Sequence, residues 1–212
     1  MLFHKLLNSR SRYAPIMATL SLLLMFYQQP AIAEQASDAH HEHHHHHAMP
    51  AGVERSEAAY TVPNVTLINQ HGEKVFLTEL LDTDRPVMLN FIFTSCTAIC
   101  PAMSATFASV QNKLGSDSEK LRMISVSIDP EYDTPRALSA YAKRFKAGPQ
   151  WEFLTGSLDD SVAVQKAFDA DRGDKMNHAP MTLMRATPGS QWIRYEGFAR
   201  ADELAEEIRG MF

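Results

Sequence analysis

Cys96 and Cys100 are the only two cysteines of the chain, and they flank Thr-Ala-Ile in the segment CTAICP. On one helical turn, three intervening residues allow both sulfurs to face the same side. There they could close a disulfide, form a redox pair or hold one soft metal ion. A plain stabilising disulfide is disfavoured, because so small a loop removes little entropy from the unfolded chain. A thioredoxin-type redox motif and a haem-attachment motif would each have two intervening residues, so the spacing leaves redox and metal chemistry both open.

His178 is the third candidate metal ligand. It precedes an apolar segment, 181–186, which we expect to form a strand antiparallel to the strand before the cysteines. The start of such a strand lies at the same sheet edge as the end of its neighbour, beside Cys96 and Cys100. Two thiolates and one imidazole suit Cu(I), with room for a fourth ligand for Cu(II), whereas structural Zn(II) usually takes four protein ligands. His71 is predicted to be a solvated turn residue instead.

The elements that position these groups follow from hydrophobic periodicity and turn residues. Apolar runs at 86–94 and 121–128 are typical of strands buried on both faces, and the helix after the first run begins at the cysteines, where its N-terminus favours thiolates. Thr134 and Pro135 are predicted to begin the next helix, with Asp133 as part of that helix start. The other expected elements are a hairpin at 62–68 and 74–77, helices at 101–114, 134–146, 159–170 and 201–212, a short strand at 151–155, and a hairpin at 181–186 and 192–197. This order predicts an α/β thioredoxin-like fold with an N-terminal β-hairpin extension and a central mixed sheet flanked by helices.

The 212 residues support one domain of about 150 residues with extensions. Residues 1–33 are predicted to be a signal peptide, because a basic start and an apolar stretch at 16–26 precede the small residues Ala-Ile-Ala at 31–33. The alternative is an uncleaved N-terminal helix that anchors the protein. Either way we expect an exported, periplasmic domain at 59–212, preceded by a flexible His-rich arm at 34–58. The net charge of -5 argues against nucleic acid as a partner.

The arm contains seven histidines within eight positions: His40, His41, His43, His44, His45, His46 and His47. Neutral imidazoles on a flexible segment bind Cu(II), Ni(II) or Zn(II) without ordered geometry. We therefore predict an auxiliary metal-capture tract. An expression tag is the alternative, but the glutamate within the tract and its place just after a natural-looking cleavage site favour a native feature.

Several segments in this order and spacing resemble the Sco/SenC family: PVMLNFIFTSCTAICPAMSATF, SIDPEYDTPRALSAYAKRF, WEFLTG, and His178 followed by a strand. The resemblance spans about 60–212. It implies a thioredoxin-like fold that binds one copper ion, Cu(I) or Cu(II), through Cys96, Cys100 and His178. It further implies a metallochaperone whose partner is an exported or membrane-bound copper enzyme, typically the CuA site of a cytochrome c oxidase subunit.

Residues near these motifs qualify the resemblance. Asp129, at the end of the second buried strand, is either a turn residue or an acceptor that orients a ligand or partner. The family's histidine commonly follows Asp, whereas Asn177 precedes it here, so a negative group beside the ligand is missing. Met103 is predicted to belong to the core from its helical spacing, while Met176 is an open candidate for a soft auxiliary donor.

A periplasmic thiol-disulfide oxidoreductase is the alternative function. Cys96 would attack a disulfide of a copper-site partner, Cys100 would resolve the mixed disulfide, and a thiol reductant would restore the pair. Pro180, just before the predicted strand, is similar to the proline beside the cysteines in thioredoxin-like oxidoreductases. Whether the chain is an enzyme stays open, and we favour a binding protein that turns over no substrate.

Overall fold

The computed structural model describes residues 52–212. The predicted signal peptide and the histidine tract lie outside the described residues. The strands are β1 (Glu54–Ala58), β2 (Thr66–Asn69), β3 (Lys74–Phe76), β4 (Val87–Ile92), β5 (Arg122–Ser127), β6 (Trp151–Thr155), β7 (Met181–Arg185) and β8 (Trp192–Glu196). The helices are α1 (Leu77–Leu81), α2 (Ile99–Leu114), α3 (Pro135–Arg144), α4 (Leu158–Ala167) and α5 (Ala201–Arg209), with 3-10 turns η1 (Gly115–Lys120) and η2 (Lys175–Asn177). Within this part of the chain, no helix combines the length and apolarity that crossing a membrane requires.

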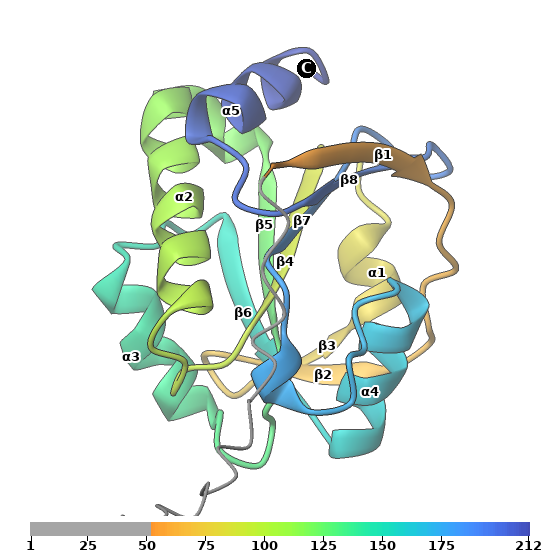
Figure 1. The fold of residues 1–212 in the computed structure, drawn as a ribbon, viewed down its shortest axis with the longest axis vertical. Helices are drawn as coiled ribbons and strands as arrows, with labels where there is room; N and C mark the ends of the chain where they lie inside the picture. Colours follow the sequence, from red (N-terminus) through yellow and green to blue (C-terminus); the bar gives the residue numbers. More distant parts are fainter. Residues whose placement is uncertain (1–51) are drawn as a thin grey trace, which may run out of the picture. The chain divides into compact units, whose positions relative to one another are not determined.

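The eight strands form one mixed sheet in the order β1-β8-β7-β4-β5-β6-β2-β3 (Figure 1). β4, β5 and β6 run parallel to one another, and every other neighbouring pair is antiparallel. All six residues of β4 are buried, because helices cover both faces of the sheet at its centre. This double coverage explains the near-continuous apolar run in the sequence of this strand.

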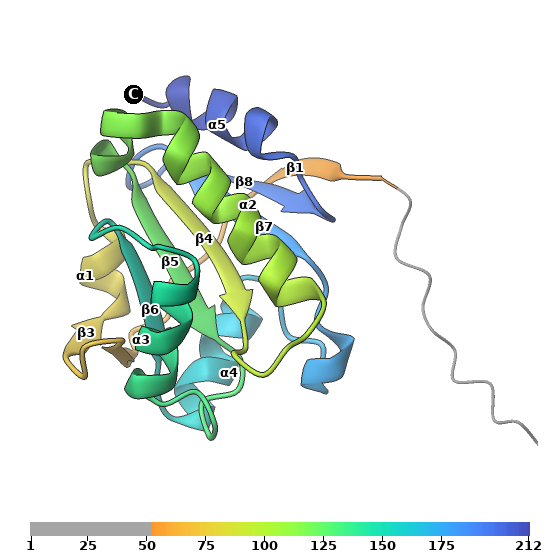
Figure 2. The ribbon, with the colours of Figure 1, turned by 90° about the vertical axis from the view of Figure 1, so that its left-hand side faces the viewer.

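Helices pack on the two faces of the sheet in separate groups (Figures 1 and 2). On one face α2, α3 and α5 bury a core that includes Phe107, Trp151 and Ile208. On the other face α1 and α4 pack over Leu89 and Phe168. Side chains along a strand point alternately to the two faces, so each central strand contributes to both cores.

The predicted order of elements is confirmed, and the structure adds one strand and one α-helix that the sequence analysis missed. Residues 54–58, assigned above to the flexible arm at 34–58, form the edge strand β1, which pairs with β8. The folded domain therefore begins before residue 59. β1 has the sequence ERSEA and is largely exposed, so it carries none of the apolar alternation that predicts a strand. The short helix α1 follows β3, where no helix was predicted.

The edge of the sheet where β4 ends is also where β7 begins. The two strands are antiparallel, with Asn90 opposite Thr182 and Val87 opposite Arg185. β5 runs parallel to β4, so the segment after Ser127 reaches the same edge. The antiparallel pairing assumed in placing His178 near the cysteines is thus confirmed.

Candidate metal centre

The two cysteines lie at the junction between β4 and α2, and both are free thiols. Cys96 is half-buried in the turn, and its N–H donates to the Phe93 carbonyl at 3.2 Å. Cys100 lies in the first turn of α2 and is fully buried. Its backbone N–H donates to the Cys96 Sγ atom at 3.4 Å. The sulfur of Cys96 therefore accepts one of the N–H groups that a helix start leaves without an intrahelical partner.

The two thiols differ in acidity. Burial of Cys96 opposes ionisation, but hydrogen bonds from backbone N–H groups at the start of α2 outweigh it and lower the pKa below the usual 9.0. Burial raises the pKa of Cys100 far more strongly, and the hydrogen bond from the Phe93 N–H at 3.4 Å offsets little of that increase. Negative charge on Cys96 and on Asp133 raises the pKa of Cys100 further. Cys96 is consequently the accessible, more acidic thiol, and Cys100 is held protonated behind it.

Asp133 has a larger role than the helix-start position predicted for it. Its carboxylate is completely buried and accepts hydrogen bonds from the Thr94 N–H at 3.1 Å, the Thr94 hydroxyl at 2.5 Å and the Ser127 hydroxyl at 2.6 Å. It thereby joins the end of β5 to the segment that leads from β4 to Cys96. Thr134 is the N-cap of α3 as predicted, and its hydroxyl accepts from the Ala137 N–H at 3.2 Å.

His178 follows η2 and has 6% of its surface exposed. Burial lowers its pKa to about 4, a hydrogen bond with the Phe91 backbone opposes this shift, and the positive charge of Arg172 adds to it. The buried Nε2 atom has no hydrogen-bond partner among the described residues. His178 therefore presents a neutral imidazole with an unpartnered nitrogen, which is the form that ligates metals.

Cys96 and His178 line the same cavity, which has a volume of about 240 Å³. Its other walls are mostly apolar and include Phe93, Ile99 and Met176. Cys100 lies behind Cys96 and does not line the cavity. Within residues 52–212, no group of three or more His, Cys, Asp or Glu side chains is arranged to hold a metal ion as it stands. The structure thus brings Cys96 beside Cys100 and opens Cys96 and His178 to one cavity, without closing a three-ligand site.

Asp129 contacts a lysine and not one of the predicted ligands. Its buried carboxylate accepts from the Lys175 Nζ atom at 2.7 Å. The ammonium group of Lys175 also lies 4.9 Å from the ring centroid of Tyr132 and 5.8 Å from that of Phe93. Lys175 lines the cavity, so Asp129 fixes a positive charge at its wall. The sequence alone does not predict this contact, because 46 residues separate Lys175 from Asp129.

The two methionines considered as soft donors have different surroundings. Met103 is 2% exposed and belongs to the core, as predicted from its spacing. Met176 is 74% exposed and lines the cavity next to Cys96 and His178. His71 is exposed in the turn between β2 and β3, as expected.

The model of the SCO1/SenC family matches residues 53–212. A SCO1 protein homolog of Bacillus subtilis (strain 168) is 39% identical over 160 residues, which cover 71% of this chain and 82% of that protein. The solved structure of BsSco, described as a member of the Sco family of cytochrome c oxidase assembly proteins with a disulfide switch, is 30% identical. It has a TM-score of 0.62 and covers 74% of this chain and 95% of its own. Copper-bound ScoI of Bradyrhizobium japonicum, 22% identical with a TM-score of 0.59, covers 69% of this chain and 96% of its own and shares the fold. The Sco/SenC resemblance and the thioredoxin-like fold are therefore confirmed, and the chain belongs to the SCO1/SenC family.

Proposed function

We propose that the chain is a copper metallochaperone that binds one copper ion through Cys96, Cys100 and His178. The observation that carries this proposal is the buried, unpartnered Nε2 atom of His178, in a residue that lines the same cavity as Cys96. A buried polar atom without a partner costs free energy, and a metal ion at this position would satisfy it. Copper-bound relatives in the same family support the choice of metal.

The donor set favours copper in its reduced state. Thiolates are soft ligands that select Cu(I), and two of them with one imidazole leave the ion three-coordinate. Because the three groups are not preassembled, copper would draw the loop with His178 and the cysteine turn together. Cys100, whose pKa is raised, would lose its proton on binding, so we expect copper uptake to release protons and to weaken as pH falls.

Delivery would proceed by ligand exchange, in which donors of the acceptor replace Cys96, Cys100 and His178 one at a time. Relatives described as cytochrome c oxidase assembly proteins support an oxidase subunit as the acceptor. We therefore propose its CuA site as the destination and the periplasm as the location. The exposed side of the cavity, where Cys96 and Met176 lie, is the side from which an acceptor would approach.

Copper titration tests the binding site directly. Cu(I) is titrated against a competing chelator into the thiol-reduced full chain in which Ser replaces the seven histidines of the arm. We expect one tightly bound ion. Cys96→Ser and His178→Ala should each weaken binding by more than the roughly 10–100-fold that changes outside the ligand shell cost. His71→Ala, which removes an exposed histidine, is the control, and unchanged affinity in both ligand variants would overturn the site.

The difference in acidity between the two cysteines supports a second function, reduction of a partner disulfide. The Cys96 thiolate would attack one sulfur of the partner disulfide, forming a mixed disulfide and releasing one partner thiolate. Cys100, after losing its proton, would then attack the Cys96 sulfur, which forms the Cys96–Cys100 disulfide and releases the second partner thiolate. Two electrons pass to the partner, and a thiol reductant restores the pair. The Cys100→Ser variant should accumulate mixed disulfides in exporting cells, whereas Cys96→Ser should not, and absence of adducts in both would exclude this function.

The histidine tract is proposed to capture metal for the cysteine site. Its histidines end at His47, with six residues between it and the start of β1 at Glu54, so metal bound to the tract would be held at a high local concentration near the domain. Copper loading at limiting supply should therefore slow when Ser replaces the tract, while the final affinity of the cysteine site stays the same. Equal loading rates would leave the tract without this role.

A further inference from the structure

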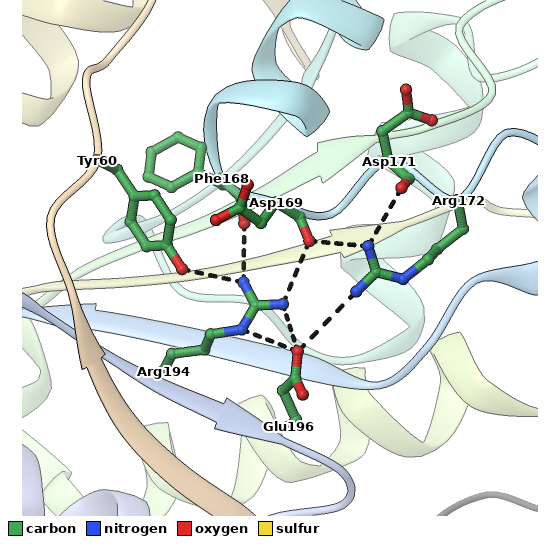
Figure 3. Close-up of polar contacts among 7 residues, drawn as sticks. All are labelled: Tyr60, Phe168, Asp169, Asp171, Arg172, Arg194 and Glu196. Carbon is green, nitrogen blue, oxygen red and sulfur yellow. Dashed lines mark hydrogen bonds and ion pairs between the residues drawn. The ribbon is translucent and has the colours of Figure 1, made fainter.

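The loop that connects α4 to His178 is held at its base by one buried arginine. Arg194 extends from β8 and has 7% of its surface exposed (Figure 3). Its Nη1 atom donates to the Phe168 carbonyl at 2.8 Å, and its Nη2 atom donates to the Asp169 carbonyl at 3.2 Å. The same Nη1 atom donates to the Tyr60 hydroxyl at 3.0 Å. One guanidinium thus joins the sheet, the loop and the segment that follows β1.

A second arginine and a shared carboxylate complete this cluster, which we name the Arg194 clamp (Tyr60, Phe168, Asp169, Asp171, Arg172, Arg194 and Glu196; Figure 3). Glu196 accepts from the Arg194 Nε atom at 2.9 Å and lies 3.9 Å from Nη2 of Arg172. Arg172 donates to the carbonyls of Asp169 and Asp171 at 2.9 and 3.1 Å. Both arginines therefore bind the Asp169 carbonyl, and the carboxylate of Glu196 lies between their two positive charges.

The backbone at the base of the loop needs this support. Asp169 has a φ of 53°, in the left-handed region that costs a residue with a side chain more than it costs glycine. Such a conformation persists only where its surroundings hold it, and here two guanidinium groups hold its carbonyl. From Asp169 the chain reaches His178 through short turns, without pairing to the sheet before β7.

We propose that Arg194 is a positioning residue that sets the place of His178 for copper binding, an inference that rests on the proposed function. The clamp fixes the start of the loop, and two contacts fix its end. Lys175 binds Asp129 at 2.7 Å, and the Gly197 N–H donates to the Pro180 carbonyl at 2.9 Å. With both ends held, His178 has little entropy left to lose when its Nε2 atom binds the metal.

A conservative pair of variants separates positioning from general stability. Arg194→Lys keeps the positive charge, but a single ammonium cannot reach both carbonyls, Tyr60 and Glu196 at once. Arg185→Lys is the matched control, because Arg185 is also a buried arginine that donates to one backbone carbonyl, that of Leu81. Arg185 lies at the end of β7 opposite to His178. Both variants are made in the full chain with the seven arm histidines replaced by Ser.

The measurements are Cu(I) affinity, the imidazole signal in copper X-ray absorption spectra, hydrogen exchange of the 169–178 amides without metal, and the melting temperature. Arg194→Lys should weaken copper binding about 10–100-fold, lose or reduce the imidazole signal and speed exchange in the loop. Arg185→Lys should lower the melting temperature with less than about a threefold change in affinity. Tyr60→Phe removes one hydrogen-bond acceptor of Arg194 and should weaken copper binding less than Arg194→Lys does. This second variant keeps the test valid if Arg194→Lys does not fold.

The outcomes distinguish this inference from the function on which it rests. A reference chain that binds no copper would overturn the proposed function and this inference together. The positioning role alone would be overturned if the reference chain binds copper and Arg194→Lys keeps the same copper affinity and imidazole signal. Tyr60→Phe takes the place of Arg194→Lys in this comparison if Arg194→Lys does not fold. If Arg185→Lys lowers the melting temperature as much as Arg194→Lys and weakens copper binding equally, the effect of Arg194→Lys is one of stability alone.

Discussion

Cys96 and His178 reach one cavity from two regions that are built differently. The cysteines lie at a strand–helix junction, where backbone hydrogen bonds and the buried carboxylate of Asp133 hold them. His178 lies at the end of a loop that depends on the side chain of Arg194, which binds backbone carbonyls. A strand–helix junction with one buried carboxylate therefore fixes the sulfur side, whereas side-chain contacts to an irregular loop fix the imidazole side. We expect the histidine side to lose its order more readily than the sulfur side when one of these contacts is removed.

Removing the support on the sulfur side should have the largest effect on stability. Asp133→Ala leaves the partly buried Thr94 N–H and hydroxyl and the buried Ser127 hydroxyl without their acceptor. We expect the free energy of unfolding to fall by about 4 kcal/mol, measured by urea denaturation. Asp159→Ala removes an exposed carboxylate and should cost about 0.5 kcal/mol. If both variants lose only a small amount of unfolding free energy, Asp133 does not support the cysteine side as proposed.

On the histidine side, stability of the metal-free chain should depend on pH. Burial lowers the pKa of His178 to about 4 from 6.5 in the unfolded chain, so between these values the unfolded state binds more protons. The contribution is fully present above pH 6.5 and is lost progressively as the pH falls from 6.5 through about 4, for a total of about 3 kcal/mol. Denaturation of the chelator-treated protein at pH 7 and pH 4 should show this loss, and His178→Leu should remove most of it. An identical pH dependence in the variant would exclude His178 as its source.

The contrast within the cysteine pair can be measured by alkylation. With a lowered pKa and partial exposure, Cys96 should react at pH 7 about 100-fold faster than the buried Cys100, as followed by mass spectrometry of the thiol-reduced chain. The rate for Cys96 should rise with pH and reach half its maximum below pH 9. Comparable rates at the two cysteines would mean that the helix start does not distinguish them.

The smallest effect is expected at the tip of the loop. Lys175 is partly exposed, and its contact with Asp129 is the polar side-chain contact that joins η2 to the rest of the sheet edge. Lys175→Gln should speed hydrogen exchange of the neighbouring loop amides about threefold, less than Arg194→Lys does. Exchange faster than in Arg194→Lys would show that the tip, and not the base, holds the loop.

Sequence patterns predicted the sulfur side of the site better than its surroundings. Buried strands, a helix start and a cysteine pair are local signals, and the antiparallel β4–β7 pairing carried His178 to the same edge. Arg194 gave no such signal, because its partners are backbone carbonyls of a loop 25 to 26 residues away. Asp133 was predicted as part of a helix start, since nothing in DPEYDTP reveals that Thr94 binds it across the sheet edge. Contacts between a side chain and a distant backbone leave no periodic pattern.

The ends of the sheet were the other part that periodicity did not reveal. β1 was missed because strand prediction depends on an apolar face, and most of its residues are exposed. The hairpin at the other end was predicted, although β2 is shorter than expected. Buried central strands such as β4 were thus predicted from the sequence more accurately than the exposed edge strands.

The two edge strands also affect the tendency of the protein to self-associate at high concentration. An open strand edge offers unpaired N–H and C=O groups, on which another chain can add a strand and begin aggregation. β1 opposes this with charged residues such as Glu54, Arg55 and Glu57, while β3 at the other end is only three residues long and begins with Lys74. Charged side chains disfavour strand addition at β1, and the short length of β3 disfavours it at the other edge. Within the described residues, both edge strands therefore carry features that disfavour the addition of a strand from another copy of the chain.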